Sequence, residues 1–267
     1  MSRVGFLGAG RMGAPMVSRL VQAGHDVRVL GRSEAKRAAV TELGAVPVAD
    51  ATAAVDGADV VVVCLFTDDQ VREVLCAKLL AAIPAGAALV VHTTGSPHTV
   101  ERLRDLGPHL AVLDAPVSGG PHDIAAGQVT LFVGGTEEAV TQARPVLAAY
   151  ADPVLHVGPL GAGQKVKLIN NTLFAAQIGL LAEAAKLAGS LGVRESALLE
   201  ALPHGSGASR ALGNVARAGS TAAFIAAVGE FIGKDVAVVR QTVAELGTDL
   251  GRLDAVVDAG LGIGSQA

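Results

Sequence analysis

The sequence predicts an α/β fold, a doubly wound parallel sheet over residues 1–160, followed by an all-helical domain over residues 161–267. Short apolar runs alternate with helical segments through about residue 158, which is typical of a sheet with crossover helices. The run at 58–66 lacks polar alternation, as expected for a strand buried on both faces of a parallel sheet. From residue 164 to 191 the pattern lacks proline and is apolar on all sides, which predicts one long buried helix. This helix, over 161–191, is expected to join the two domains.

Composition restricts the class of protein. Half of the 267 residues are hydrophobic but only 3% are aromatic, so the core must be built from Ala, Val and Leu. The net charge of −4 provides no basic surface for nucleic acid. No apolar run reaches the roughly 20 residues that span a bilayer, and the first residues lack the features of a signal peptide. We therefore expect a cytoplasmic protein with neither nucleic acid nor a membrane as partner.

The first predicted unit is a strand at 3–7, a helix at 13–23 and a strand at 26–30. Between the first strand and the helix lies Gly8-Ala9-Gly10-Arg11-Met12-Gly13, a GxGxxG motif. In a βαβ unit of about 30 residues this motif is typical of dinucleotide binding. Gly8 permits the tight turn, Gly10 lets the backbone approach a pyrophosphate, and Gly13 allows close helix packing. Three glycines that serve only a turn are the alternative.

The end of the second strand predicts which cofactor binds. No acid stands there to hold a ribose 2′-hydroxyl, and the segment begins Gly31-Arg32-Ser33 with two further cations behind it. Arginine binds phosphate in a forked, charge-assisted geometry, so Arg32 and Ser33 favour NADP(H) over NAD(H). Ser33 is also a good N-cap for the next helix, and the two roles are compatible.

Further strands are expected at 46–48, 58–66, 88–92, 109–113, 128–134 and 153–157, and a helix is expected from Thr67 to about residue 80. Ligands of an open α/β sheet bind outside the carboxyl ends of its strands, so residues that follow two of these strands are expected to line the cofactor site. They are Leu65, Phe66, Thr67 and Thr94. Plain helix-capping roles explain the two threonines equally well. The histidines and the two cysteines show no metal-ligand spacing, so no metal site is predicted. Cys64, within a strand-like run, is expected to be a small core residue.

A glycine-rich loop over 114–127 carries one hydroxyl group, that of Ser118. Exposed backbone N–H groups at Ser118, Gly119 and Gly120 are suited to hold a carboxylate, as a nest of backbone donors holds an anion. A long turn between two strands is the alternative interpretation. The loop therefore predicts a site for a small carboxylate-bearing substrate.

The long helix opens with Gly161-Ala162-Gly163 and carries Lys167 and Asn171, which are four residues apart and so share one face. A cation and an amide on one face of an apolar helix indicate a site, although a lysine that extends to the surface is the alternative. Lys165 competes for the role, but its position faces away from the other two. Further helices are expected at 194–201, 209–218, 221–246 and 251–259.

Four motifs in this order resemble those of the β-hydroxyacid dehydrogenase family. They are the cofactor motif at 5–13, the loop at 114–120, the Gly161-to-Asn171 segment, and Lys234-Asp235. The resemblance covers nearly the whole chain. It implies that Lys167 is the general acid/base and that Asn171 helps to hold the substrate. It further implies a substrate carboxylate at Ser118, Gly119 and Gly120.

The resemblance also implies cofactor contacts from Thr94 and Lys234, an arginine after the second strand for NADP, and a homodimer or homotetramer with interlocking helical domains. The expected reaction is hydride transfer between a small β-hydroxyacid and its semialdehyde or keto form. Two alternatives stay open: an imine or ketone reductase of a related branch, which usually lacks the lysine, and a non-catalytic cofactor-binding module. The chain departs from the family where His92 stands near a usual acid and where the segment after Lys234-Asp235 is short.

Overall fold

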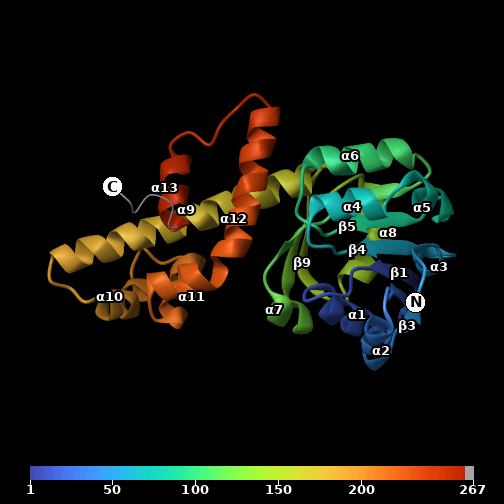
Figure 1. Ribbon diagram of the computed structural model, residues 1–267, viewed down its shortest axis with the longest axis horizontal. Coiled ribbons are helices and arrows are strands. Elements are labelled where there is room, and N and C mark those ends of the chain that lie inside the picture. Colours follow the sequence, from blue (N-terminus) through green and yellow to red (C-terminus); the bar gives the residue numbers. More distant parts are fainter. Residues whose placement is uncertain (262–267) are drawn as a thin grey trace. The chain divides into compact units, whose positions relative to one another are not determined.

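The computed structural model describes residues 1–261, apart from the side chains of residues 230, 231 and 260. The chain forms two compact units, residues 1–167 and the residues from 168 onward (Figure 1). This division falls inside the long helix, which begins at Ala162. The domain boundary that the sequence predicts, between residues 160 and 161, marks the change from alternating strands and helices to helices alone and remains a proposal.

The first unit is built on a sheet of nine strands. In chain order they are β1 (Arg3–Leu7), β2 (Asp26–Leu30), β3 (Val46–Val48), β4 (Val60–Val63), β5 (Ala88–Val91), β6 (Ala111–Asp114), β7 (Val117–Ser118), β8 (Val129–Gly134) and β9 (Ala151–Gly158). The sheet order is β3-β2-β1-β4-β5-β6-β8-β7, with β9 paired to β8. The first six strands, β1 to β6, pair in parallel, whereas β8 runs antiparallel to β6 and β7. The predicted doubly wound sheet is confirmed, and its antiparallel extension is a feature that we did not predict.

Eight helices accompany the sheet. They are α1 (Gly13–Gln22), α2 (Glu34–Glu42), α3 (Ala51–Val55), α4 (Asp68–Val74), α5 (Ala77–Ala82), α6 (Pro97–Leu106), α7 (Pro121–Ala125) and α8 (Glu137–Leu147). The single helix expected up to about residue 80 is two helices, because Leu75 leaves the helical conformation with ψ of 52°. The loop expected over 114–127 contains β7 and α7.

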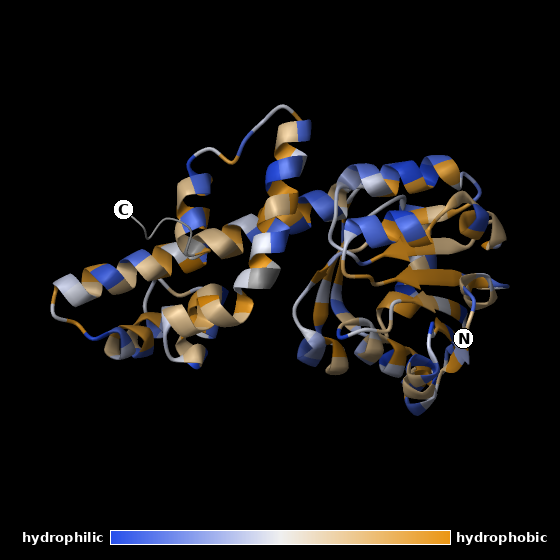
Figure 2. Cartoon of the chain, viewed as in Figure 1, coloured by the Kyte–Doolittle hydropathy of each residue, from blue (hydrophilic) through white to orange (hydrophobic). Residues whose placement is uncertain are grey.

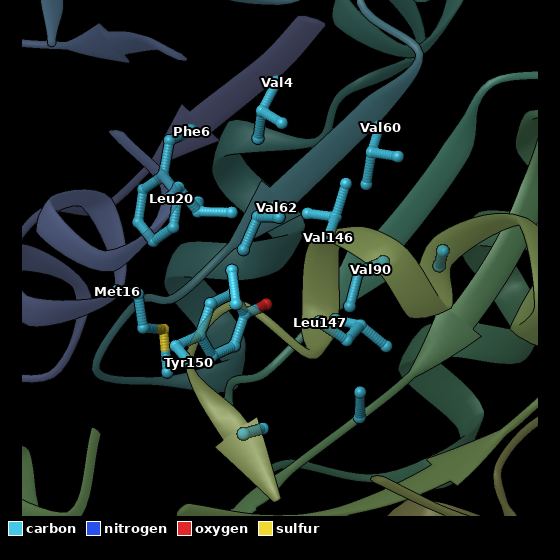
Figure 3. Packing of buried hydrophobic residues seen from close by; sticks show 14 of the residues in the cluster. Val4, Phe6, Met16, Leu20, Val60, Val62, Val90, Val146, Leu147 and Tyr150 are labelled. Atoms are coloured by element: carbon cyan, nitrogen blue, oxygen red, sulfur yellow. The ribbon is translucent and has the colours of Figure 1, made fainter. Parts of the chain in front are cut away.

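Each face of the sheet has its own core. Val60 and Val62 of β4 belong to the cluster that contains Phe6 and Tyr150, part of which is drawn in Figure 3. Val61 and Val63 point to the opposite cluster. Alternate residues of a strand point to opposite faces, so this strand is buried on both, as its continuous apolar run predicted. The central strands β4 and β5 are accordingly apolar throughout, in the orange range of Figure 2.

The second unit is all-helical. The long helix α9 (Ala162–Ser190) enters it and is followed by α10 (Glu195–Ala201), a 3-10 turn (Leu202–His204), α11 (Arg210–Ala218), α12 (Thr221–Glu245) and α13 (Leu253–Gly260). Its core is small and includes Ala175 and Ile178 of α9 and Val236 of α12. Arg240 of α12 forms ion pairs with Asp254 and Asp258 of α13.

Four large apolar side chains of α9, and that of Leu191 directly after the helix, are exposed, although the sequence predicted a helix buried on all sides. They are Ile169, Leu173, Leu180, Leu187 and Leu191, each 51–71% exposed. At 100° per residue they fall within about 40° of one another around the helix axis, and we call them the α9 stripe. The prediction of burial is therefore wrong for this face of the helix in a single chain.

None of the described helices alone has the length and hydropathy of a membrane span. The bent pair Arg210–Ala218 and Thr221–Gly229 passes that test by length and composition only.

Candidate cofactor and catalytic site

The predicted cofactor residues gather where the strand order reverses. β1 pairs with both β2 and β4. From β1 the sheet continues to one side through β2 and β3 and to the other side through β4, β5 and β6. Such a reversal opens a crevice at the carboxyl ends of the strands. The GxGxxG turn follows β1, and Leu65, Phe66 and Thr67 follow β4, so these two predicted segments lie at one edge of the sheet.

The three glycines of the turn have different surroundings. Gly8 has a φ of 106°, and a Cβ there would lie 2.2 Å from the carbonyl oxygen of Cys64. A Cβ on Gly13 would lie 2.1 Å from the carbonyl oxygen of Gly8, whereas one on Gly10 would meet nothing within 4 Å. The fold itself therefore requires Gly8 and Gly13. Gly10 leaves open space, as an approach to a ligand requires.

The start of α1 is suited to an anion. Its N-cap residue, Met12, makes no side-chain cap hydrogen bond, and the preceding Arg11 is exposed. Backbone N–H groups in the first turn of a helix have no partner within the helix, and the helix dipole favours negative charge there. The turn and the helix start thus fit the pyrophosphate of a dinucleotide.

The polar residues of the segment after β2 make different contacts. The Ser33 hydroxyl caps α2 by accepting a hydrogen bond from the Lys36 N–H. Arg37 folds back, and its guanidinium donates to the carbonyl oxygen of Gly31 at 3.1 Å. Arg32 is exposed on this turn. A contact between Arg32 and a 2′-phosphate remains a prediction, while the capping role of Ser33 is confirmed.

The two candidate threonines differ. The Thr67 hydroxyl accepts from the Gln70 N–H at 3.2 Å in a capping box at the start of α4, so its capping role is confirmed. Helix α6 is capped by Ser96 and not by Thr94, so the capping interpretation of Thr94 is wrong. The neighbouring Thr93 accepts a hydrogen bond from the Leu65 N–H at 2.9 Å. Thr93 therefore ties the end of β5 to the end of β4.

A buried carboxylate holds the start of α9. Asp114, at the end of β6, is fully buried and accepts from the Gly161 N–H at 2.7 Å and from the Gln164 N–H at 2.6 Å. Burial raises the pKa of Asp114, and the two N–H donors oppose that rise. A Cβ on Gly163 would lie 2.3 Å from the carbonyl oxygen of Phe132 and 2.8 Å from Asp114 Oδ2. Only glycine therefore allows this close approach.

The Gln164 side chain makes a second connection. It is 1% exposed, its Oε1 accepts from the Gly95 N–H at 3.0 Å, and its Nε2 donates to the Thr93 carbonyl oxygen at 2.8 Å. The peptide groups on both sides of Thr94 are thus held by one amide. Thr94 itself is half-buried at this edge.

The two lysines of α9 differ in exposure. Lys165 is exposed, whereas Lys167 is half-buried. Lys167 stands three residues after Gln164 and four before Asn171 on a continuous helix, so these three residues share one face. The choice of Lys167 over Lys165 remains a prediction, and the difference in exposure supports it.

Within the second unit, Asn171 is held by α12. Its Nδ2 donates to Asp235 Oδ2 at 2.7 Å, and Lys234 Nζ lies 3.5 Å from Asp235 Oδ1. The carboxylate of Asp235 thus orients the amide that we predicted to contact the substrate. The sequence placed Asp235 in a motif but gave it no role.

The carboxylate-binding loop differs from the expectation at one donor. The Gly120 N–H, which we expected to offer to a substrate, donates to Asp123 Oδ2 at 2.6 Å. Asp123 stands at the third position of α7, and its carboxylate binds the N–H of the N-cap residue Gly120. Gly119 adopts a φ of 138°, a conformation open to glycine. Of the three predicted donors, the N–H of Gly120 is therefore used in a hydrogen bond within the loop itself.

His92 is a buried core residue. Its Nδ1 lies 2.5 Å from the Ala115 carbonyl oxygen and its Nε2 lies 2.8 Å from the Tyr150 hydroxyl oxygen. The carbonyl requires an N–H at Nδ1, so Nε2 accepts the hydrogen bond of Tyr150. Burial lowers the pKa of His92 to about 4, which keeps the ring neutral. Burial also raises the pKa of the Cys64 thiol to about 12, in agreement with its prediction as a small core residue.

Among residues 1–261, no group of three or more His, Cys, Asp and Glu side chains is arranged to hold a metal ion. The polar residues that the sequence analysis missed are Thr93, Asp114, Asp123, Gln164 and Asp235. All lie in or beside motifs that it singled out. For Thr93, Asp114, Asp123 and Gln164 the signal was a polar side chain at a strand end or in the first turn of a helix, whereas Asp235 lies in the middle of α12.

Comparisons with known proteins agree with this geometry. Residues 3–158 match the family model of the NAD binding domain of 6-phosphogluconate dehydrogenase. Residues 161–259 match the model described as NAD-binding of NADP-dependent 3-hydroxyisobutyrate dehydrogenase. The NAD-dependent L-serine dehydrogenase of Pseudomonas aeruginosa is 37% identical over 218 residues, which cover 79% of this chain and 72% of that protein.

A probable 3-hydroxyisobutyrate dehydrogenase of Mycobacterium tuberculosis is 37% identical over 209 residues, covering 78% of this chain and 71% of the relative. The solved structure of a 3-hydroxyisobutyrate dehydrogenase of that organism with L-serine has a TM-score of 0.87 at 31% identity, covering 97% of this chain and 92% of the other. An imine reductase from Pseudomonas sp. has a TM-score of 0.67 at 22% identity and shows a common fold only.

The nucleotide-binding sheet, the helical unit and these matches define an NAD(P)-dependent dehydrogenase that acts on a hydroxyl group. The chain belongs to the β-hydroxyacid dehydrogenase family, the family of 3-hydroxyisobutyrate dehydrogenase.

Proposed function

We propose that this enzyme interconverts a small β-hydroxyacid and its semialdehyde or keto form, uses NADP(H) in preference to NAD(H), and employs Lys167 as general acid/base. The observation that carries the proposal is the position of Lys167. It lies in the second turn of α9, and Asp114 and Gln164 fasten the first turn of this helix to the carboxyl ends of β6 and β5. Ligands of such a sheet bind at these ends.

The reaction needs a proton transfer at the substrate oxygen. When bound, the nicotinamide accepts or supplies the hydride. In reduction the Lys167 ammonium donates a proton to the carbonyl oxygen, and in oxidation its neutral amine removes the hydroxyl proton. Asn171, oriented by Asp235, hydrogen-bonds the same substrate, and the Ser118 hydroxyl and the Gly119 N–H hold its carboxylate.

The substrate class follows from the loop and the relatives. L-Serine and 3-hydroxyisobutyrate, which the names of the relatives contain, both carry a hydroxyl group on the carbon β to a carboxylate. A carboxylate suits the N–H donors of the glycine-rich loop, and a β-hydroxyl suits a single acid/base. We propose substrates of this size and pattern.

Lys167→Ala tests the assignment, with Lys165→Ala as the matched control on the same helix. We expect kcat to fall by about 10³-fold or more in the first variant because the proton donor is lost. The control should retain kcat within a few-fold, and the dissociation constant of NADP(H), measured by fluorescence, should be nearly the same in both. A Lys167→Ala enzyme with near-normal turnover would overturn the proposal.

The cofactor preference rests on Arg32. In Arg32→Ala the ratio of kcat/KM for NADPH to that for NADH should fall about tenfold or more, because a charge-assisted contact with the 2′-phosphate is lost. Lys78→Ala, at an exposed lysine of α5 outside this segment, is the control. An unchanged ratio in Arg32→Ala contradicts the proposed preference.

A panel of β-hydroxyacids, semialdehydes and cyclic imines, followed by NADPH absorbance, separates the remaining alternatives. Turnover of imines without a need for a carboxylate would identify a reductase of the other branch. Cofactor binding without turnover of any compound would identify a binding module. Lys167 supports the hydroxyacid reaction, because a proton donor at the substrate oxygen is what that reaction requires. Cytoplasmic location remains a prediction of the sequence.

We also propose that the protein forms a homodimer, alone or within a tetramer, through the α9 stripe. The stripe extends from Ile169 to Leu191, a rise of about 33 Å at helical spacing. A contiguous apolar surface of this kind marks an interaction site. Two copies of one helix related by a two-fold axis present the same residues to each other, so the stripe can be covered by its own counterpart.

A further inference from the structure

The first turn of α9 and the segment after β5 are joined by one buried amide, that of Gln164. The amide uses both of its functions on this segment, since its oxygen binds the Gly95 N–H and its nitrogen binds the Thr93 carbonyl oxygen. The backbone of the same residue donates to Asp114 at the end of β6. Gln164 therefore links α9 to two neighbouring strand ends.

The position of Gln164 on the helix relates this link to the chemistry. Gln164, Lys167 and Asn171 follow the spacing i, i+3, i+7 and lie on one face of α9. Thr94, a predicted cofactor contact, stands between the two peptide groups that the amide holds. A shift of the Gln164 amide thus moves the loop that carries Thr94 relative to the helix that carries Lys167.

We propose that Gln164 is a positioning residue of the reaction, which sets the distance between the Thr93–Gly95 loop at the nicotinamide and the ammonium group of Lys167. This inference rests on the proposed function, because it assumes that Lys167 is the acid/base. The Gln164 side chain acts through its two backbone partners and through the helix, and it has no proton to exchange in the reaction.

The contacts explain why an amide stands at this position. The segment presents one donor, the Gly95 N–H, and one acceptor, the Thr93 carbonyl oxygen, at a site where the side chain is 1% exposed. A buried polar group without a partner destabilises the fold, so the occupant must accept and donate at once. An ionised carboxylate of the same shape only accepts, whereas a protonated one does both.

This difference provides a test with a pH signature. In Gln164→Glu the new carboxyl group lies at Gly95, against which the carboxylate of Asp68 of α4 packs. Asp114, which binds the backbone N–H of residue 164, and Lys165, Lys167 and Glu101 of α6 are further ionisable groups near the start of α9. Burial and the neighbouring carboxylate both favour the protonated form. The Gln164→Glu enzyme should therefore be active at low pH and lose kcat as the new group ionises. The wild type should lack this additional titration.

The experiment measures kcat and KM against pH for the wild type, Gln164→Glu and Gln164→Met, with Gln142→Glu as a surface control. Methionine has nearly the volume of glutamine but makes neither hydrogen bond, so we expect kcat to fall about 100-fold at every pH, the cost of a displacement of about 1 Å. The dissociation constant of NADP(H) should change by less than tenfold. Thermal unfolding, recorded at each pH, should show the Gln164→Glu protein still folded where its kcat has fallen.

The outcomes separate the two proposals. Gln164→Glu and Gln164→Met enzymes whose kcat runs parallel to the wild type, or falls only where the proteins unfold, overturn the positioning role. An additional titration in Gln142→Glu overturns it as well, because the effect would then come from charge alone. If Lys167→Ala keeps its turnover, the proposed function fails, whatever the Gln164 variants show.

Discussion

The two units stabilise their buried groups in different ways, and α9 belongs to both. In the first unit buried polar groups have defined partners, such as Asp114 with two N–H donors and His92 between Ala115 and Tyr150. In the second unit the core is a small cluster with much alanine, and the α9 stripe is exposed. The first unit thus satisfies its residues within one chain, whereas the second leaves an apolar surface to be covered.

The most drastic test of this comparison removes the apolar surface. In Leu180→Asp/Leu187→Asp we expect a dimer dissociation constant at least about 10³-fold higher, because each buried leucine contributes about 2 kcal/mol and an interfacial charge adds a further cost. Analytical ultracentrifugation measures the change. Leu106→Asp, at an exposed leucine of α6 in the first unit, should leave the dissociation constant unchanged. A variant that stays as associated as the wild type, or a wild type that is monomeric, contradicts the role of the stripe.

Two glycines of α9 sharpen the comparison. Gly163→Ala places a Cβ against the Phe132 carbonyl and Asp114, and we expect it to reduce the free energy of unfolding by about 3–5 kcal/mol. Gly189→Ala, in the same helix, meets nothing within 4 Å and should increase stability by up to about 1 kcal/mol. Denaturant unfolding measures both. Equal effects of the two substitutions would show that the close fit at Gly163 is unimportant.

The smallest expected effect concerns His92. Its folded pKa of about 4 lies below the ordinary value of 6.5, so the unfolded chain binds a proton first as the pH falls. Stability is then fully present above about pH 6.5 and is lost progressively towards pH 4. The loss from His92 should reach about 2 kcal/mol at pH 5. Asp114, whose pKa burial raises, contributes with the opposite sign, but equally in the variants compared.

His92→Gln should reduce this pH dependence of the unfolding free energy between pH 7 and 5, whereas His122→Gln, at an exposed position, should not. Denaturant titrations at several pH values measure the slope. If both variants keep the slope of the wild type, His92 is not the group that loses stability in acid.

Local pattern was sufficient for most of the fold. The apolar run of β4, the strand-turn-helix at the GxGxxG motif and the extent of α9 follow from periodicity and from residues that are near in sequence. The same local rules predicted Ser33 as a cap and Cys64 as a core residue. They misjudged the α9 stripe, because an apolar helix that packs in its own chain has the same sequence pattern as one that packs against a partner.

The sequence by itself determined the order of the elements, the glycine turn and the shared face of Lys167 and Asn171, because these depend on spacings of a few residues. Only the tertiary structure decided the joint at the start of α9. Asp114 and Gly161 are 47 residues apart, and Gly95 and Gln164 are 69 apart. No local pattern encodes a hydrogen bond over that separation, because the sheet brings its strand ends together only after folding.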